Sequence, residues 1–163
     1  MDSEIIVIRS LSVQEWHKLA AEGNAPPVRI TLSGYSMNPL IRGYRDYVTV
    51  VPINGLPSKG DIVLFREPSA GRYVIHRVWS VQNGMILTWG DNCNRPDGWF
   101  LPEAILGKVD MIERGRKKIH PDPVKGIKWA KIWHKAGKGY RLYHRYKESI
   151  LRRIKKARTG ENK

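Results

Sequence analysis

Short runs of alternating apolar and polar residues, or of β-branched residues, occupy the middle of this chain. Six of these runs predict β-strands, at residues 29–32, 47–51, 61–65, 73–79, 85–89 and 104–112. Gly and Pro lie between most of them, and Asn83-Gly84 is a strong signal for a hairpin between the fourth and fifth runs. The pattern predicts a mainly β fold, a compact and mostly antiparallel domain over residues 29–113.

A short helix is predicted before this domain, within an N-terminal lead of residues 1–28. Ser12 and Glu15 form a capping box, with Ser12 at the N-cap and Glu15 three residues later. The helix should run from residue 13 to about residue 22, because Gly23 is placed to end it.

The last part of the chain, residues 114–163, changes character. Residues 114–123 contain two prolines and predict a linker. Helical periodicity then extends from residue 124 to about residue 157, and Gly137 and Gly139 are expected to divide it into two helices. We therefore expect a basic amphipathic helical extension after the β domain.

Positive charge is concentrated in that extension. The chain carries a net charge of +14, and residues 114–163 hold 18 of its 29 Lys/Arg but only 3 of its 15 Asp/Glu. Such asymmetry indicates a phosphate-rich partner. Basic helices with Trp and Tyr at the polar boundary favour an anionic membrane surface. Nucleic acid binding and a merely solvated extension stay open as alternatives.

Composition narrows the class of protein further. The single cysteine, Cys93, excludes an intramolecular disulfide and fits a reducing compartment. No run approaches the roughly 20 apolar residues needed to span a bilayer, and the acidic start is unlike a secretory signal. We expect a cytoplasmic location, peripheral on the inner face of the membrane if the extension binds lipid. The five histidines are scattered without metal-ligand spacing, so neither a metal nor a cofactor is predicted.

Three short segments carry candidate chemistry. Ser36 follows Gly34 and precedes Pro39, His76 lies inside an apolar run, and Asp97 follows Asp91 by six residues. A serine hydroxyl needs a base to remove its proton during attack, and histidine suits that role. An aspartate on the other ring nitrogen orients the imidazole. The sequence thus contains the parts of a serine hydrolase, and the Ser36 amide is a candidate donor to an oxyanion.

These segments together resemble the signal peptidase I family, within the serine peptidase clan that includes self-cleaving SOS repressors. The resemblance covers residues 29–113 and rests on five motifs in order: Gly-x-Ser-Met-x-Pro around Ser36, Gly-Asp-Ile-Val at 60–63, His-Arg-Val at 76–78, Gly-Asp-Asn at 90–92 and Gly-Lys-Val at 107–109. It implies that Ser36 is the nucleophile, His76 the general base, Asp97 the orienting acid and Asp91 a supporting carboxylate. Histidine in place of the usual bacterial lysine is similar to the endoplasmic-reticulum and archaeal type.

The chain departs from the family in informative ways. Gly34 stands where signal peptidases usually carry a second serine, so the oxyanion hole is expected to be mostly backbone, with Ser33 a candidate helper. We expect no N-terminal membrane anchor of the signal peptidase kind, which argues against bulk secretory cleavage. Ala70-Gly71 resembles a repressor cleavage site but lies between Ser36 and His76.

Two functions follow as hypotheses. The first is a serine endopeptidase that removes a leader or pro-segment from a peptide or protein, with small residues before the scissile bond implied by the resemblance. The second is an inactive peptidase-like binding module, in which the basic extension acts at an anionic membrane or on nucleic acid.

Overall fold

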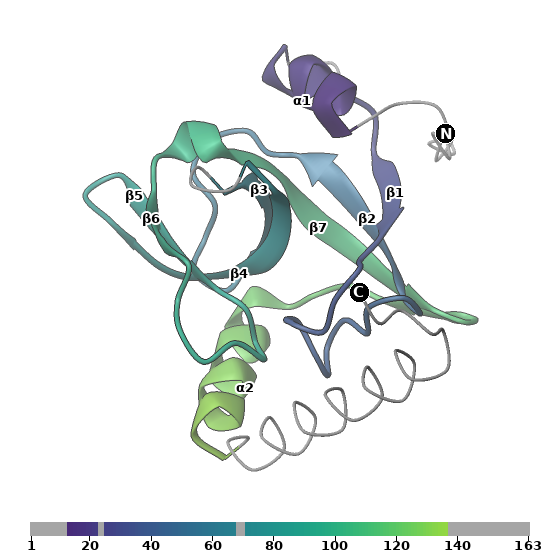
Figure 1. The fold of residues 1–163 in the computed structure, drawn as a ribbon, viewed down its shortest axis with the longest axis vertical. Helices are drawn as coiled ribbons and strands as arrows, with labels where there is room; N and C mark the ends of the chain where they lie inside the picture. Colours follow the sequence, from purple (N-terminus) through teal and green to yellow (C-terminus); the bar gives the residue numbers. More distant parts are fainter. Residues whose placement is uncertain (1–12, 23–24, 68–70, 137–163) are drawn as a thin grey trace, which may run out of the picture.

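A computed structural model describes residues 13–22, 25–67 and 71–136 of the 163-residue chain (Figure 1). It contains, in order, α1 (Val13–Ala21), β1 (Val28–Thr31), β2 (Tyr47–Pro52), β3 (Ile62–Arg66), β4 (Tyr73–Gln82), β5 (Met85–Trp89), β6 (Gly98–Phe100), a 3₁₀ turn η1 (Pro102–Ala104), β7 (Ile105–Arg114), β8 (Lys117–Ile119) and α2 (Pro123–Ala136). The protein is therefore mainly β, with a short helix near the N-terminus and a longer one after the last strand.

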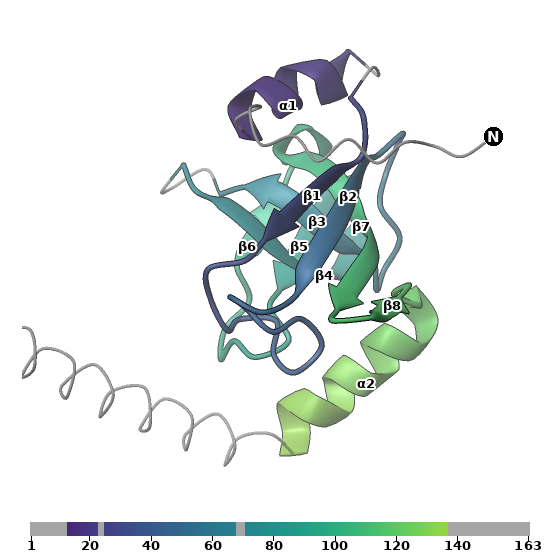
Figure 2. The same cartoon turned by 90° about the vertical axis from the view of Figure 1, so that its right-hand side faces the viewer.

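All eight strands belong to one antiparallel sheet. Its order is β1-β2-β7-β3-β4-β5-β6, and β8 pairs with the far end of β7. The sheet is strongly curved, so that β4 and β5 lie opposite β1 and β2 (Figure 2). Register shifts occur within three of the strand pairs, β2 with β7, β3 with β7, and β4 with β5. Irregularities of this kind bend strands and increase their twist, which helps the sheet to curl.

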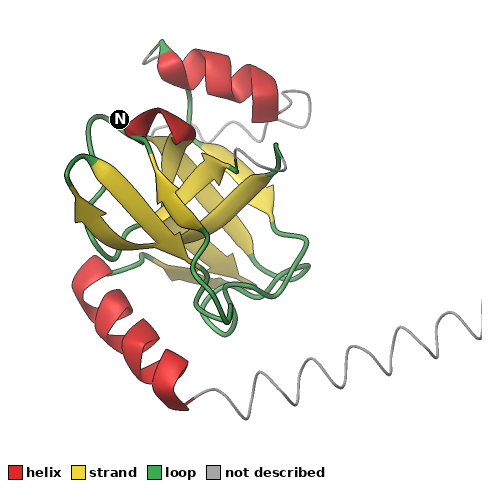
Figure 3. Ribbon diagram, turned by 60° about the vertical axis from the view of Figure 1, so that its left-hand side comes forward, coloured by secondary structure: helices red, strands yellow, loops and turns green. Residues whose placement is uncertain are grey.

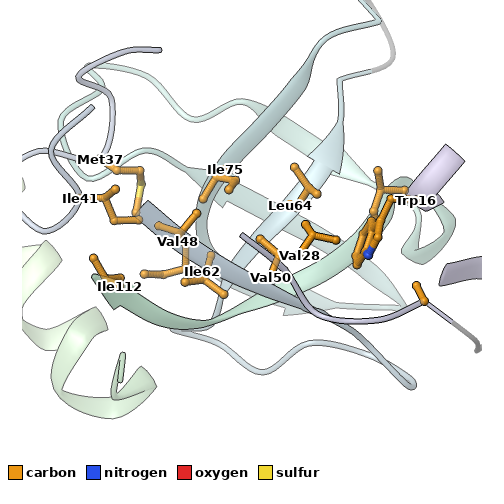
Figure 4. Close-up of a cluster of buried hydrophobic side chains, with 13 residues drawn as sticks. Trp16, Val28, Met37, Ile41, Val48, Val50, Ile62, Leu64, Ile75 and Ile112 are labelled. Atoms are coloured by element: carbon orange, nitrogen blue, oxygen red, sulfur yellow. The ribbon is translucent and has the colours of Figure 1, made fainter. Parts of the chain in front are cut away.

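The inner face of the curved sheet holds the larger of two apolar clusters (Figure 4). Alternate residues of β2, such as Val48 and Val50, point into it and are fully buried. Trp16 of α1 closes one end of the cluster and donates from Nε1 to the Pro26 carbonyl at 2.7 Å. A second cluster surrounds Phe65 between β3, β4 and β6.

The six predicted strands are confirmed as β1 to β5 and β7, and the Asn83-Gly84 hairpin is confirmed with both residues at positive φ. The sequence prediction missed β6 and β8. Each has only three residues, and neither Gly98–Phe100 nor Lys117–Ile119 shows the period of a buried strand. The prediction of a linker over residues 114–123 was therefore partly wrong, because β8 lies within this range and pairs with β7.

The helix predicted at residues 13–22 is confirmed as α1, while its cap Ser12 lies outside the described residues. The first helix of the basic extension is confirmed as α2, and the second one, beyond Gly137, is not among the described residues. α2 packs on the domain through buried Ile127 and Ala130. It lies at the same end of the sheet as the connections 32–46 and 90–97 (Figures 1 and 3).

Candidate functional site

Ser36 lies in the long connection between β1 and β2, where the chain leaves the sheet. Met37 is 1% exposed and packs in the main core, so it anchors this connection. A Cβ at Gly43 would overlap the carbonyl of Gly34, which explains why glycine is needed where the two turns of the connection touch. Asp46 accepts from the amide of Arg42 at 2.8 Å and pairs with Arg114 of β7. These contacts hold Ser36, which is partly exposed, at the edge of the core.

His76 lies in the middle of β4, and the structure brings Asp97 to it. The distance between His76 Nδ1 and Asp97 Oδ2 is 2.7 Å. Thr88 of β5 donates its hydroxyl to the same carboxylate oxygen at 2.8 Å. Because a carboxylate only accepts, Nδ1 is the ring nitrogen that carries the proton in this contact. The expected pairing of His76 with Asp97 is therefore present, with Thr88 as a second donor that orients the carboxylate.

The environment of His76 pulls its pKa in two directions. Burial disfavours the charged ring and lowers the pKa, but the hydrogen bond to Asp97 and the nearby Cys93 thiol raise it by more, from 6.5 to about 9. The imidazole is therefore mainly protonated at neutral pH. A base of this kind becomes more effective as the pH rises toward 9.

Ser36 and His76 line one cavity of about 380 Å³. One wall is the chain from Leu32 to Met37, and the other is the start of β4 with the residue before it, from Arg72 to His76. His76 Nε2 is buried and makes no hydrogen bond of good geometry with any described residue, Ser36 Oγ included, although the Cys93 sulfur lies near it. Catalytic hydrogen bonds are often absent before substrate binds, so the base nitrogen is available, and His76 lines the same cavity as Ser36.

The turn after β5 connects Ser36 to the His76 side of the site. The Asn92 amide donates to the Ser36 carbonyl at 2.7 Å, and Asn92 Nδ2 donates to the Tyr35 carbonyl at 3.0 Å. A Cβ at Gly90 would come within 3 Å of His76 Nε2, Cys93 Sγ and the Ser36 carbonyl oxygen. Only glycine therefore lets the turn approach both candidate catalytic residues so closely.

Asp91 has a different partner from the other candidate residues. Its two carboxylate oxygens accept from Nε and Nη2 of Arg77 at 2.8 and 2.7 Å, and both side chains are almost completely buried. Arg77 also donates to the Gly60 carbonyl at 2.9 Å. A Cβ at Gly126 of α2 would approach Arg77 Nη1 to 2.5 Å, so α2 covers the guanidinium group. The structure thus places Asp91 on Arg77 and away from His76 Nδ1.

Sequence reasoning missed the roles of three residues at this site. Arg77 was noted only as part of a motif, although an arginine inside an apolar strand needs a buried partner, and Asp91 was the carboxylate available. Thr88 had no distinguishing signal, because threonine is common in strands. The Cys93 sulfur lies beside Gly90 close to the His76 ring, a proximity that no pattern in the sequence shows.

Neither a cation site nor a membrane span is found in the described part of the chain. No group of three His, Cys, Asp or Glu residues there could hold a metal ion, and none of its helices combines the length and apolarity that crossing a bilayer requires.

Comparison with protein-family models, with curated proteins and with solved structures finds no match for this chain.

Proposed function

We propose that the protein is a serine endopeptidase of the signal-peptidase-like type, in which Ser36 is the nucleophile, His76 the base and Asp97 the residue that orients the base. One observation carries the proposal: the His76 ring is bound to Asp97 at Nδ1, its Nε2 makes no hydrogen bond with a described residue, and His76 and Ser36 line the same cavity. A hydroxyl, an imidazole and a carboxylate in this relation are the parts of a serine hydrolase.

The reaction would proceed in two steps. Ser36 Oγ attacks the scissile carbonyl carbon and passes its proton to His76 Nε2, which then protonates the leaving amine. Water next attacks the Ser36 ester with His76 again as base, and the acid product leaves. Asp97 and Thr88 hold the ring in one orientation through both steps. Asp91 acts indirectly, by fixing the turn that contacts Ser36.

An unpaired stretch of strand supports a peptide as substrate. β3 pairs with β4 along residues 73–77, but β5 pairs with β4 only from Arg77 onward. Within the described residues, the other edge of β4 at 73–76 therefore has no strand beside it, and this edge forms one wall of the cavity. An extended peptide can add to such an edge through main-chain hydrogen bonds. The scissile bond would then lie beside Ser36, with small side chains before it.

The test is acylation of the purified protein by a serine-directed lactam or fluorophosphonate probe, read by intact mass and peptide mapping. We expect one adduct, on Ser36, that is lost in Ser36→Ala and His76→Ala. Ser58→Ala is the matched control, because Ser58 is exposed and does not line this cavity, and it should keep the adduct. Small-residue peptides should be cleaved by the wild type and not by Ser36→Ala. An adduct that survives in Ser36→Ala, or that is lost equally in Ser58→Ala, would refute the assignment.

The exposed face of α2 favours a second function, docking on an anionic membrane surface. Trp129, Ile132 and Val124 are exposed large apolar residues on this helix. Four exposed lysines lie among them, namely Lys125, Lys128, Lys131 and Lys135. Exposed aromatic and aliphatic side chains with lysines between them suit the boundary of an anionic bilayer. We propose that α2 contributes to membrane binding whether or not the site is catalytic.

Vesicle cosedimentation of the full chain tests this second function. We expect binding to phosphatidylglycerol vesicles, little binding to phosphatidylcholine, and clear loss in Trp129→Ala with Ile132→Ala. Trp99→Ala with Leu101→Ala is the matched control, because Trp99 and Trp129 are both 43% exposed and Leu101 is also an exposed aliphatic residue. Equal loss in both pairs, or tighter binding to duplex or single-stranded nucleic acid at the same ionic strength, would count against lipid docking by α2.

A further inference from the structure

Cys93, the only cysteine of the chain, occupies a fixed position in the turn after β5. Its amide donates to the Gly90 carbonyl at 2.9 Å, and its carbonyl accepts from Trp89 Nε1 at 3.0 Å. The residue as a whole is partly exposed. Its backbone is thus held in place by two hydrogen bonds at a position that is not fully buried.

The sulfur faces the base of the candidate site. A Cβ at Gly90 would lie 2.7 Å from Cys93 Sγ and 2.8 Å from His76 Nε2, so both atoms border the same small space over Gly90. The His76 side chain is only 7% exposed, and its Nε2 has no hydrogen-bond partner in the described part of the chain. A buried, unpartnered ring nitrogen therefore adjoins the thiol, while Asp97 holds the opposite nitrogen.

This arrangement favours reaction at sulfur. The thiolate is the reactive form of cysteine, and cysteines paired with a histidine are among the reactive ones. Cys93 has this setting, because its sulfur and His76 Nε2 border the same space while Asp97 binds Nδ1. The Cys93 thiol, the His76 imidazole and the Asp97 carboxylate thus form a second candidate triad. It shares its imidazole and its carboxylate with the proposed Ser36 triad.

We propose that Cys93 is a site of covalent modification by small electrophiles and peroxides, and that its modification blocks the Ser36 and His76 site. The second half of this proposal rests on the proposed function, and the first half does not. Little room exists around Gly90, because a single added carbon there already comes within 3 Å of three atoms. A group attached to Cys93 Sγ would therefore occupy the space in front of His76 Nε2.

Two kinds of reagent, an alkylating agent and a peroxide, would react at the Cys93 sulfur. With iodoacetamide, the thiolate sulfur attacks the methylene carbon, a sulfur–carbon bond forms and iodide leaves. With hydrogen peroxide, the sulfur attacks one oxygen, the oxygen–oxygen bond breaks, and sulfenic acid and water result. A small thiol such as glutathione then displaces water to form a mixed disulfide. The disulfide partner must come from another molecule, because the chain has no second cysteine.

The first test is the rate of iodoacetamide reaction at pH 7 in the full-length protein, followed by intact mass. We expect native Cys93 to react several-fold to roughly tenfold faster than the same protein unfolded in urea, with correction for the effect of urea on free glutathione. His76→Ala and Asp97→Asn should each bring the native rate down toward the unfolded rate. Circular dichroism shows whether each variant is folded, and Asp97→Asn keeps the side-chain shape if His76→Ala does not fold. A native rate no faster than the unfolded rate would overturn the proposal that Cys93 is a site of modification.

The second test compares Ser36 acylation before and after alkylation. We expect alkylation to reduce the rate of Ser36 acylation at least tenfold in the wild type. In Cys93→Ala, the rate of Ser36 acylation should be the same with and without iodoacetamide treatment. Acylation that persists in fully alkylated wild type would overturn the block. If Ser36 is not acylated in any sample, the proposed function fails, and the alkylation rates alone still decide whether Cys93 is a modification site.

Discussion

Replacing Asp97 with asparagine should lower the pKa of His76 and remove a pH-dependent part of the stability. In the wild type the pKa is raised from 6.5 to about 9, because the hydrogen bond to Asp97 and the nearby Cys93 outweigh the effect of burial. At about 1.4 kcal/mol for each pKa unit, the difference between these values corresponds to about 3 kcal/mol. Asparagine retains the shape but not the charge, so burial should dominate and the pKa of His76 should fall toward 6.5 or below.

The sign of the stability effect follows from proton binding. The folded protein holds the His76 proton more tightly than the unfolded chain does, so the stabilisation is complete below pH 6.5 and is lost as the pH rises through about 9. The free energy of unfolding of the wild type minus that of Asp97→Asn should therefore shrink by up to about 3 kcal/mol between pH 6 and pH 9.5. Groups that titrate alike in both proteins cancel in this difference.

Two measurements check this reasoning. NMR titration of the His76 ring proton gives the pKa directly, and urea unfolding at several pH values gives the difference in stability. Asp110→Asn is the matched control, because Asp110 faces His120 at 3.8 Å in an exposed pair that water screens, and it should show no comparable pH dependence. A wild-type His76 that titrates near 6.5, or a stability difference that does not change with pH, would refute the assignment of Asp97 as its charge partner.

Three further changes test other parts of the site. The rate of Ser36 acylation, where it occurs, should rise with pH up to about 9, because only neutral His76 accepts the proton; a rate that is flat from pH 6 to pH 9 would contradict this. Asp91→Asn should lower the free energy of unfolding by about 3–5 kcal/mol in urea titrations, because it leaves the Arg77 charge buried without its partner; a loss below about 1 kcal/mol would argue against a structural ion pair. Gly90→Ala should lower the free energy of unfolding by about 1–3 kcal/mol and abolish Ser36 acylation, because its Cβ would overlap three atoms of the site. A Cβ at Gly34 meets no atom within 4 Å, so Gly34→Ala should change the stability little.

The sheet could be predicted largely from sequence because its long strands carry the signals that burial imposes. Val48 and Val50 lie on the core face of β2 with the polar Thr49 between them, and Asn83-Gly84 supplies the positive φ values that a tight hairpin needs. The strands β6 and β8 could not be predicted in this way. They have three residues each and lie at the margins of the sheet, where pairing with a neighbour decides the structure and no period of apolar residues is needed.

The candidate site was predictable in its members but only partly in its contacts. The pairing of His76 with Asp97 was expected and is present, because the antiparallel pairing of β4 with β5 brings the connection after β5 back across β4. The position of Asp91 was not derivable, since a carboxylate in a turn can face several partners. Its contact depends on Arg77, whose burial is set by strands and by α2, far away in sequence.

Strand alternation explains how these separate contacts build one site. His76 and Arg77 are neighbours in β4, so their side chains leave opposite faces of the strand. His76 faces the cavity, while Arg77 reaches the other way and binds Asp91 in a buried two-pronged ion pair. That pair holds the turn after β5 against β4, and the next amide in the turn, that of Asn92, donates to the Ser36 carbonyl. Loss of the ion pair should therefore displace Ser36 from His76 although neither Arg77 nor Asp91 contacts the base nitrogen. In Asp91→Asn we consequently expect Ser36 acylation to fall even under conditions where the protein remains folded, and Arg77→Met combined with Asp91→Leu, which replaces the pair by apolar side chains, should recover stability without recovering acylation.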